Sequence, residues 1–211
     1  MLKACRKLEI IHYDLSGPVL IPSINRNTYI MYFIDDYTMM CWIYLLKDKS
    51  QAFKTFKKIH VWIQNEAQSH VDTIPIDNGG EYTSNELEIF LHQHGIKHQT
   101  IVSYNPRHNG VAERMNMTLL NMVHSMLFSI NVKLMFWGHD VVLHAVYLIN
   151  KRPSHALGNK TPYEMWHGHI PSMRHLKVFG PTSYALIPKE QRNKLGARNQ
   201  KCIFLGYSNT A

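Results

Sequence analysis

Residues 74–84 read IPIDNGGEYTS, and this stretch decides between two kinds of fold. A short apolar run typical of a strand ends at Asp77, and the turn-forming residues Asn78, Gly79 and Gly80 follow at once. One interpretation is a plain surface turn. The other is a buried strand whose last residue helps to bind a metal ion, and Asp77 alone does not separate the two.

The patterns on either side of this stretch predict an α/β fold. Three β-rich runs lie close together near the N-terminus and are typical of an antiparallel meander. After them, helical and strand-like patterns alternate, which indicates that a parallel part follows. The expected strands are residues 8–15, 28–37, 39–46, 71–77 and 96–102, and the helices between them are residues 50–68 and 84–95. We expect Ser50 to cap the first helix.

The second half of the chain predicts helices first and a small β unit afterwards. The expected helices are residues 111–130, 136–150 and 161–166, and the expected strands are residues 176–188 and 201–207. In the first of these helices Met115, Met117, Met122 and Met126 predict core packing. The expected parts are an α/β core with trailing helices (residues 1–153), a linker with a short helix (residues 154–175) and a partial β module (residues 176–211).

Three acidic residues stand out by their placement. Asp14 lies in the first expected strand, Asp77 ends the fourth, and Glu113 lies one turn into a helix. Asp14 and Asp77 are separated by 62 residues, and Asp77 and Glu113 by 35. In an α/β fold of this order the first and fourth strands are neighbours, so we expect the three carboxylates to converge.

Converging carboxylates repel one another unless cations compensate their charge. Sites made of carboxylate oxygens suit Mg²⁺ or Mn²⁺, and two such ions about 3.5–4 Å apart catalyse phosphodiester chemistry in many enzymes. Each residue also has a structural interpretation. Asp14 and Asp77 can be turn formers at strand ends, and Glu113 can be an acidic residue favoured by the helix dipole.

The composition indicates a globular, basic protein. A chain of 211 residues with 45% hydrophobic residues can bury a core, and a net charge of +8 suits a polyanionic partner such as a nucleic acid. Its three cysteines are odd in number and far apart, which favours a reducing intracellular compartment. No apolar run approaches the roughly 18 residues that span a bilayer. The N-terminus does not read as a signal peptide, so we expect a soluble protein without a membrane partner.

At this point the chain resembles the integrase catalytic core of copia-type LTR retrotransposons, a branch of the retroviral integrase superfamily with an RNase H-like fold. The matching stretches run in order along nearly the whole chain. They include EIIHYDLSGP, YIMYFIDDYTMMCWIYLLKDKSQAFKTFKK, IDNGGEYTSNELEIFLHQHGI, NPRHNGVAERMNMTLLNMVHSML, KTPYEMWHG and KCIFLGY. The resemblance implies a five-stranded mixed sheet flanked by helices, followed by a small SH3-like β unit.

The resemblance also implies a catalytic triad, which would be Asp14, Asp77 and Glu113 in this chain. The implied activity is metal-dependent polynucleotidyl transfer, in which DNA ends are trimmed and their 3′-hydroxyls attack target DNA. The implied partners are element and target DNA and further copies of the chain, and the implied compartment is the nucleus, although we find no clear import signal. The implied DNA-binding residues are Asn78, Arg107, His108, Asn109, Gly110 and Arg114.

Several positions depart from the family pattern. Met115 and Met117 stand where relatives usually carry basic residues, and Arg107 and His108 stand where Gln is usual. Fewer cations on this helix predict a weaker grip on phosphates there. The chain also begins only 13 residues before Asp14. We therefore expect a truncated polyprotein fragment.

Other candidates have simpler interpretations. Asp35 and Asp36 form an acidic pair that can be mistaken for metal ligands, but their context is that of a turn. His92, His94 and His98 suggest a zinc site, yet surface histidines are the simpler interpretation because Gly95 interrupts any common helix face. Three functions remain open: an integrase core, another RNase H-like nuclease, and a non-catalytic DNA-binding or assembly remnant.

Overall fold

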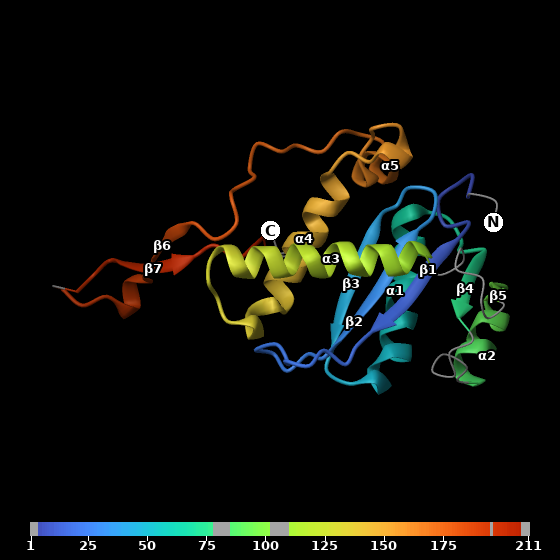
Figure 1. The fold of residues 1–211 in the computed structure, drawn as a ribbon, viewed down its shortest axis with the longest axis horizontal. Coiled ribbons are helices and arrows are strands. Elements are labelled where there is room, and N and C mark those ends of the chain that lie inside the picture. The colour runs from blue at the N-terminus through green and yellow to red at the C-terminus, as the bar shows by residue number, and fades with distance from the viewer. Residues whose placement is uncertain (1–3, 78–84, 102–109, 195, 208–211) are drawn as a thin grey trace.

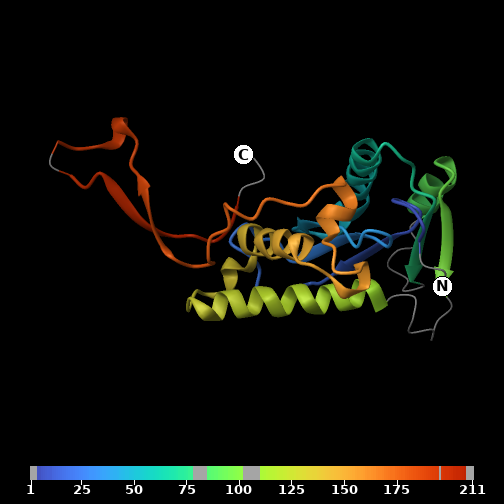
Figure 2. The ribbon, with the colours of Figure 1, turned by 90° about the horizontal axis from the view of Figure 1, so that it is seen from above.

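The computed structural model describes residues 4–77, 85–101, 110–194 and 196–207, with the backbone alone at residues 76, 77, 85, 99–101 and 139. Figures 1 and 2 show a central sheet between two helical layers, and a β ribbon that extends away from this body. The strands are β1 (Ile11–Ser16), β2 (Tyr29–Asp35), β3 (Cys41–Leu46), β4 (Thr73–Asp77), β5 (Lys97–Ile101), β6 (Thr182–Leu186) and β7 (Asn199–Ile203). The α-helices are α1 (Ala52–Ala67), α2 (Asn85–Gln93), α3 (Gly110–Ser129), α4 (His139–Lys151) and α5 (Pro162–His167). Short 3₁₀ turns are η1 (Lys49–Gln51), η2 (Leu134–Trp137), η3 (His155–Leu157) and η4 (Lys189–Gln191).

The strand order in space is β3-β2-β1-β4-β5. β1, β2 and β3 pair antiparallel, which confirms the predicted meander, and β4 and β5 pair parallel. A parallel bridge between Ile10 and Thr73 joins the two parts, and the backbone N–H of Asp72 donates to the Leu8 carbonyl at 3.0 Å beside it. β1 and β4 are therefore neighbours at the centre, as expected from the α/β pattern.

The period-2 pattern of the strands gives the sheet two apolar faces. One face of β1, β2 and β3 carries Ile11, Tyr13, Phe33 and Trp42, and it packs against α1 and α2. The opposite face packs against α3 and α4 and includes Ile30, Tyr32, Ile34, Cys41 and Ile43. Figure 2 shows α3 and α4 on one side of the sheet and α1 on the other. Because residues alternate, Asp14 belongs to the face of β1 that looks toward α3.

The start of α1 differs from the sequence-based expectation. Ser50 is not the cap: Asp48 precedes η1, and its side chain accepts a hydrogen bond from the Ser50 backbone N–H at 2.8 Å. The 3₁₀ turn continues directly into α1, so the capping side chain lies two residues earlier than predicted. The helix buries one apolar face, which carries Phe56, Ile59 and Ile63.

The methionines of α3 follow the prediction only in part. Met115, Met122 and Met126 pack against the core between the sheet, α3 and α4. Met117 does not, because it is 66% exposed on the outer side of the helix. The core-packing prediction is therefore wrong for Met117, whose position in the helical period points away from the sheet.

Asp35 and Asp36 are structural, as expected. Asp35 is fully buried and accepts hydrogen bonds from the backbone N–H of Leu8 at 2.8 Å and from the backbone and hydroxyl of Thr38 at 2.9 and 2.6 Å. Asp36 accepts from the Ala4 backbone N–H at 2.9 Å and lies 2.8 Å from His12 Nε2. Both carboxylates thus hold the N-terminal segment and the β2–β3 turn together.

His60 is a buried histidine without hydrogen-bond partners. It lies on α1, is 4% exposed, and neither ring nitrogen has a partner among the residues that the structure describes. Its ring stacks on Phe56 and meets Phe90 and His94 edge-on, at 5.4 and 5.6 Å between centroids. Burial, with the nearby charges of His94 and His70, lowers the pKa of His60 to about 4.

We expect His60→Phe to raise the free energy of unfolding by about 1 kcal/mol at pH 7, because an apolar ring removes two unsatisfied buried nitrogens. His60 binds a proton more readily in the unfolded chain, so its contribution to stability falls as the pH drops from about 6.5 toward 4. The difference in free energy of unfolding between His60→Phe and wild type should therefore be larger at pH 5 than at pH 7. Urea unfolding at both pH values measures this difference, and a difference that stays constant or becomes smaller at pH 5 would contradict this account.

The C-terminal segment returns to the core through aromatic contacts. His144 on α4 is buried, and its ring stacks on Tyr207 and lies near Phe179 and Phe204. The Tyr207 hydroxyl donates to the His175 carbonyl at 2.9 Å and accepts from the Lys177 backbone N–H at 2.6 Å. Beyond these contacts, β6 and β7 form an antiparallel ribbon that projects from the body, as Figure 1 shows.

No helix among the described residues is both long and apolar enough to cross a bilayer.

Candidate active site

Asp14 sits on β1 in a position fixed by its neighbours. Its partner across the sheet is Tyr32 of β2, whose side chain is fully buried. Burial raises the pKa of the Tyr32 hydroxyl, and the charges of Cys41 and Asp14 raise it further. The Asp14 side chain is only partly buried. Its carboxylate is therefore close to a rigid, neutral tyrosine.

Asp77 is the last residue of β4, and the bridge between β4 and β1 relates its position to that of Asp14. The bridge between the two strands joins Ile10 to Thr73, and each aspartate follows its bridge residue by four positions. Because side chains alternate along each strand, a position four residues past a bridge returns to the face of the bridge residue, so both aspartates belong to the same face of the sheet. The side chain of Asp77 itself lies outside the described part of the structure.

Glu113 lies in the first turn of α3, and its side chain is exposed. Two hydrogen bonds hold this end of the helix against the sheet. Asn116, three residues after Glu113, accepts from the Tyr32 hydroxyl at 2.6 Å and donates to the Ser16 hydroxyl at 3.1 Å. Positions three apart share a helix face, so the helix presents Glu113 and Asn116 toward the same side, next to the strand that carries Asp14.

The structure thus brings together the elements that carry the three predicted carboxylates. Among residues with described side chains, no group of three His, Cys, Asp or Glu is placed to hold a metal ion. Asp14 and Glu113 are among these residues, whereas the side chain of Asp77 is not. The triad accordingly stays a prediction.

The predicted DNA-binding residues divide into two groups. Asn78, Arg107, His108 and Asn109 lie outside the described residues. Gly110 opens α3 and is buried, and a Cβ built on it would lie 2.7 Å from Arg114 Nη1. The guanidinium of Arg114 therefore lies over the start of α3. Arg114 is exposed and follows Glu113 directly in the sequence.

Comparison with known proteins decides the family. A model of the integrase core domain matches residues 6–106, and a model of the retroviral polymerase SH3-like domain matches residues 182–211. The chain belongs to the integrase-core family of copia-type retrotransposon Pol polyproteins. It is 44% identical over 200 residues to the retrovirus-related Pol polyprotein from transposon TNT 1-94 of Nicotiana tabacum, covering 95% of this chain and 15% of that one. The polyprotein from transposon RE2 of Arabidopsis thaliana is 35% identical over 210 residues, covering 99% of this chain and 14% of that one. This chain thus spans about one seventh of the length of these relatives.

Solved structures support the same fold. A chain of the simian T-cell lymphotropic virus intasome is similar with a TM-score of 0.62 and 18% identity, over 96% of this chain and 70% of that one. The catalytic core domain of HTLV-2 integrase, solved in complex with magnesium in a trimeric form, gives a TM-score of 0.56 and 16% identity, over 76% of this chain and 97% of that one. At these identities the likeness concerns the fold. The mixed α/β architecture of this integrase core is thereby confirmed.

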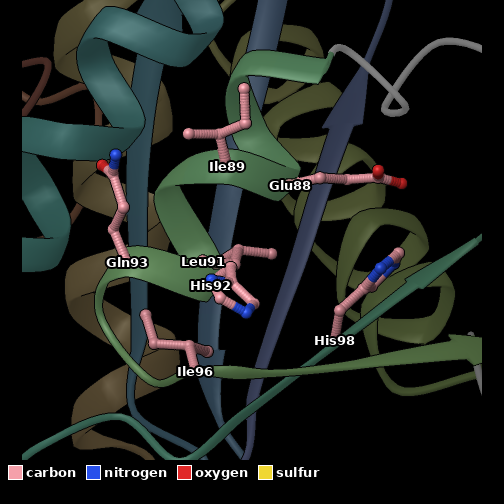
Figure 3. Close-up of a pocket in the computed structure, with 7 residues that line it drawn as sticks. All are labelled: Glu88, Ile89, Leu91, His92, Gln93, Ile96 and His98. Atoms are coloured by element: carbon pink, nitrogen blue, oxygen red, sulfur yellow. The ribbon is translucent and has the colours of Figure 1, made fainter.

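A separate hollow lies between α2 and β5, as Figure 3 shows. Its volume is about 620 Å³, and its polar lining includes Glu88, His92 and His98. In Figure 3 these three side chains do not converge on one point, in agreement with the lack of a metal-binding group among described side chains. His94 stacks on Phe90 and its Nδ1 lies 2.8 Å from the Phe90 carbonyl. The zinc interpretation of these histidines therefore finds no support.

Sequence reasoning missed Asn116 and Tyr32. Both looked like ordinary members of a helix and a strand, and the contact between them joins residues 84 positions apart. The available signal was weak: Asn is a poor helix former, so an Asn near Glu113 at helical spacing suggests a specific partner.

Proposed function

We propose that this integrase chain catalyses metal-dependent polynucleotidyl transfer, with Asp14, Asp77 and Glu113 as its catalytic carboxylates. The observation that carries the proposal is the register of β1 and β4, in which both aspartates follow the bridge between the strands by four residues. The anchored first turn of α3 adds Glu113 from the neighbouring layer. The reaction would trim DNA ends and then join their 3′-hydroxyls to target DNA.

The donor set fits Mg²⁺ or Mn²⁺. All three residues offer carboxylate oxygens, which these hard cations prefer, and Asp14 and Glu113 are accessible to hydrated ions. Two bound ions would supply activation of the attacking hydroxyl and stabilisation of the leaving oxygen. The carboxylates of this chain would hold the ions, and the raised pKa of Tyr32 keeps a neutral hydroxyl beside Asp14.

Among the described residues, Arg114 is placed to orient DNA beside this site, because it is exposed and adjacent to Glu113. Its fork of N–H donors suits a phosphate. Asn78, Arg107, His108, Asn109 and Gly110 complete the proposed DNA-binding set.

The charge distribution supports a second DNA contact in the C-terminal part. Residues 1–150 contain thirteen basic and thirteen acidic residues, whereas residues 151–211 contain ten basic and two acidic ones. Lys189, Lys194, Arg198 and Lys201 of this part are exposed on or beside the β6–β7 ribbon. A two-stranded ribbon with exposed lysines and arginines suits the groove and phosphates of a DNA duplex. We propose that the ribbon grips DNA while the core carries out the chemistry.

We further propose that residues 1–153, 154–175 and 176–211 are the core, the linker and the β module of the chain, and that the chain acts in the nucleus.

We also propose that the chain acts as a homo-oligomer. A surface that suits a second copy lies at β3, which pairs only with β2 among the described strands. Trp62 of α1 is 46% exposed there and packs edge-on against Trp42 of β3. Exposed tryptophans are typical of interface anchors.

The test is an assay of the purified chain with Mn²⁺ on branched and linear DNA substrates. The proposal predicts joined products or disintegration of the branched substrate. Cutting without joining would favour an RNase H-like nuclease, and binding without either reaction would favour an assembly remnant.

A further inference from the structure

Asn116 ties three parts of the candidate site to one another. Its side-chain oxygen accepts from the Tyr32 hydroxyl on β2, and its nitrogen donates to the Ser16 hydroxyl on β1. Tyr32 is the cross-strand partner of Asp14, and Ser16 lies two positions after Asp14 on the same face of β1. On its own helix, Asn116 lies one turn after Glu113. Both hydrogen bonds of the Asn116 amide therefore link the helix turn that carries Glu113 to residues that neighbour Asp14.

The Tyr32 end of this connection is rigid. Tyr32 is fully buried in the core between the sheet and α3, and its hydroxyl donates to Asn116 Oδ1 at 2.6 Å. A buried hydroxyl needs a partner, and Asn116 supplies it. Rotation or sliding of α3 along β1 would break this bond, so the register of α3 on the sheet is coupled to the amide.

We propose that Asn116 is a positioning residue that sets the distance between Glu113 and Asp14. The proposal rests on the proposed function, because that distance matters only if both carboxylates serve one site. A shift of about 1 Å in a reacting constellation can cost about 100-fold in rate. The amide would act through the position of α3, without touching the DNA.

The chain offers a matched control on the neighbouring helix. Asn150 of α4 also makes two hydrogen bonds to the sheet, accepting from the Cys41 backbone N–H at 2.9 Å and donating to the Cys41 carbonyl at 2.8 Å. Asn150→Ala therefore removes an equivalent tie between a helix and a strand. Asn150 is separated from Glu113, because α4 packs against β3 whereas α3 packs against β1.

The experiment compares Asn116→Ala, Asn150→Ala, Tyr32→Phe and Ser16→Ala in the full chain. Two quantities are measured: kcat and KM for Mn²⁺-dependent strand transfer, and the rise in Tm that Mn²⁺ causes. For Asn116→Ala we expect kcat to fall about 100-fold with little change in KM, and the Mn²⁺-induced rise in Tm to shrink. Tyr32→Phe and Ser16→Ala, which each remove one bond, should lose about 10-fold in kcat. Asn150→Ala should lower the Tm without Mn²⁺ and keep the wild-type kcat and Mn²⁺ response.

The outcomes separate this inference from the function on which it rests. A wild-type chain with neither transfer nor any Mn²⁺ response would remove the proposed function, and the role of Asn116 with it. An active wild type with Asn116→Ala at full kcat and full Mn²⁺ response would overturn the inference alone. Should Asn116→Ala fail to fold, wild-type kcat in both Tyr32→Phe and Ser16→Ala would overturn it as well.

Discussion

Asp77→Asn should reduce Mn²⁺-dependent strand transfer by roughly 1,000-fold or more, since members of a site that acts as a unit cannot be removed singly without losing most of the rate. Asn has nearly the same shape as Asp but lacks the charge that a divalent cation requires. Asp77 ends β4 beside β1, so the backbone should keep its pairing with Ile101 on β5. Gel assays of joined DNA products under single-turnover conditions measure the loss.

A matched control lies five residues earlier on the same segment. Asp72 is partly exposed and its carboxylate pairs with Arg6, and ion pairs in contact with solvent contribute little to stability. Asp72→Asn should keep both activity and DNA binding. If Asp77→Asn remained as active as wild type, the carboxylate would have no catalytic role and the stretch around it would be only a turn.

The second large effect concerns DNA affinity. Replacing Lys189, Lys194 and Lys201 by Gln removes three exposed charges near the β6–β7 ribbon. Each phosphate contact contributes about 0.9 to the slope of log affinity against log salt, so the slope should fall in magnitude by about 2.7. At low salt, affinity for duplex DNA should fall by one or more orders of magnitude. Fluorescence anisotropy between 50 and 300 mM salt measures both quantities.

The control for this variant uses three lysines on the opposite side of the sheet from α3. Lys54, Lys57 and Lys58 are exposed on α1, and they belong to the part of the chain in which basic and acidic residues balance. Their replacement by Gln should leave the salt slope close to that of wild type. The reverse pattern, with a large loss from the α1 variant and none from the ribbon variant, would place the DNA surface on α1.

The sequence predicts the framework well because local patterns determine it. Alternation along β1, β2 and β3 reports the two buried faces of the sheet, and the short segment between β2 and β3 leaves only an antiparallel pairing there. The parallel pair β4–β5 follows from the helix that separates the two strands. The placement of Asp14 and Glu113 on neighbouring elements follows from this framework.

Details that depend on long-range contacts were not predictable in this way. The bonds of Asn116 join residues about a hundred positions apart, and no local period reports them. The exposure of Met117 depends on where α3 rests on the sheet. The shift of the cap from Ser50 to Asp48 reflects a 3₁₀ turn before α1, whose pattern differs little from that of the helix itself.

The most direct test is a crystal structure of the chain with Mn²⁺, in which anomalous scattering locates the ions. The account predicts two Mn²⁺ ions about 3.5–4 Å apart, both bound by carboxylate oxygens of Asp14, Asp77 and Glu113. Ions bound elsewhere, or any of the three carboxylates lying more than about 12 Å from the other two, a distance that no shared cation can bridge, would contradict it.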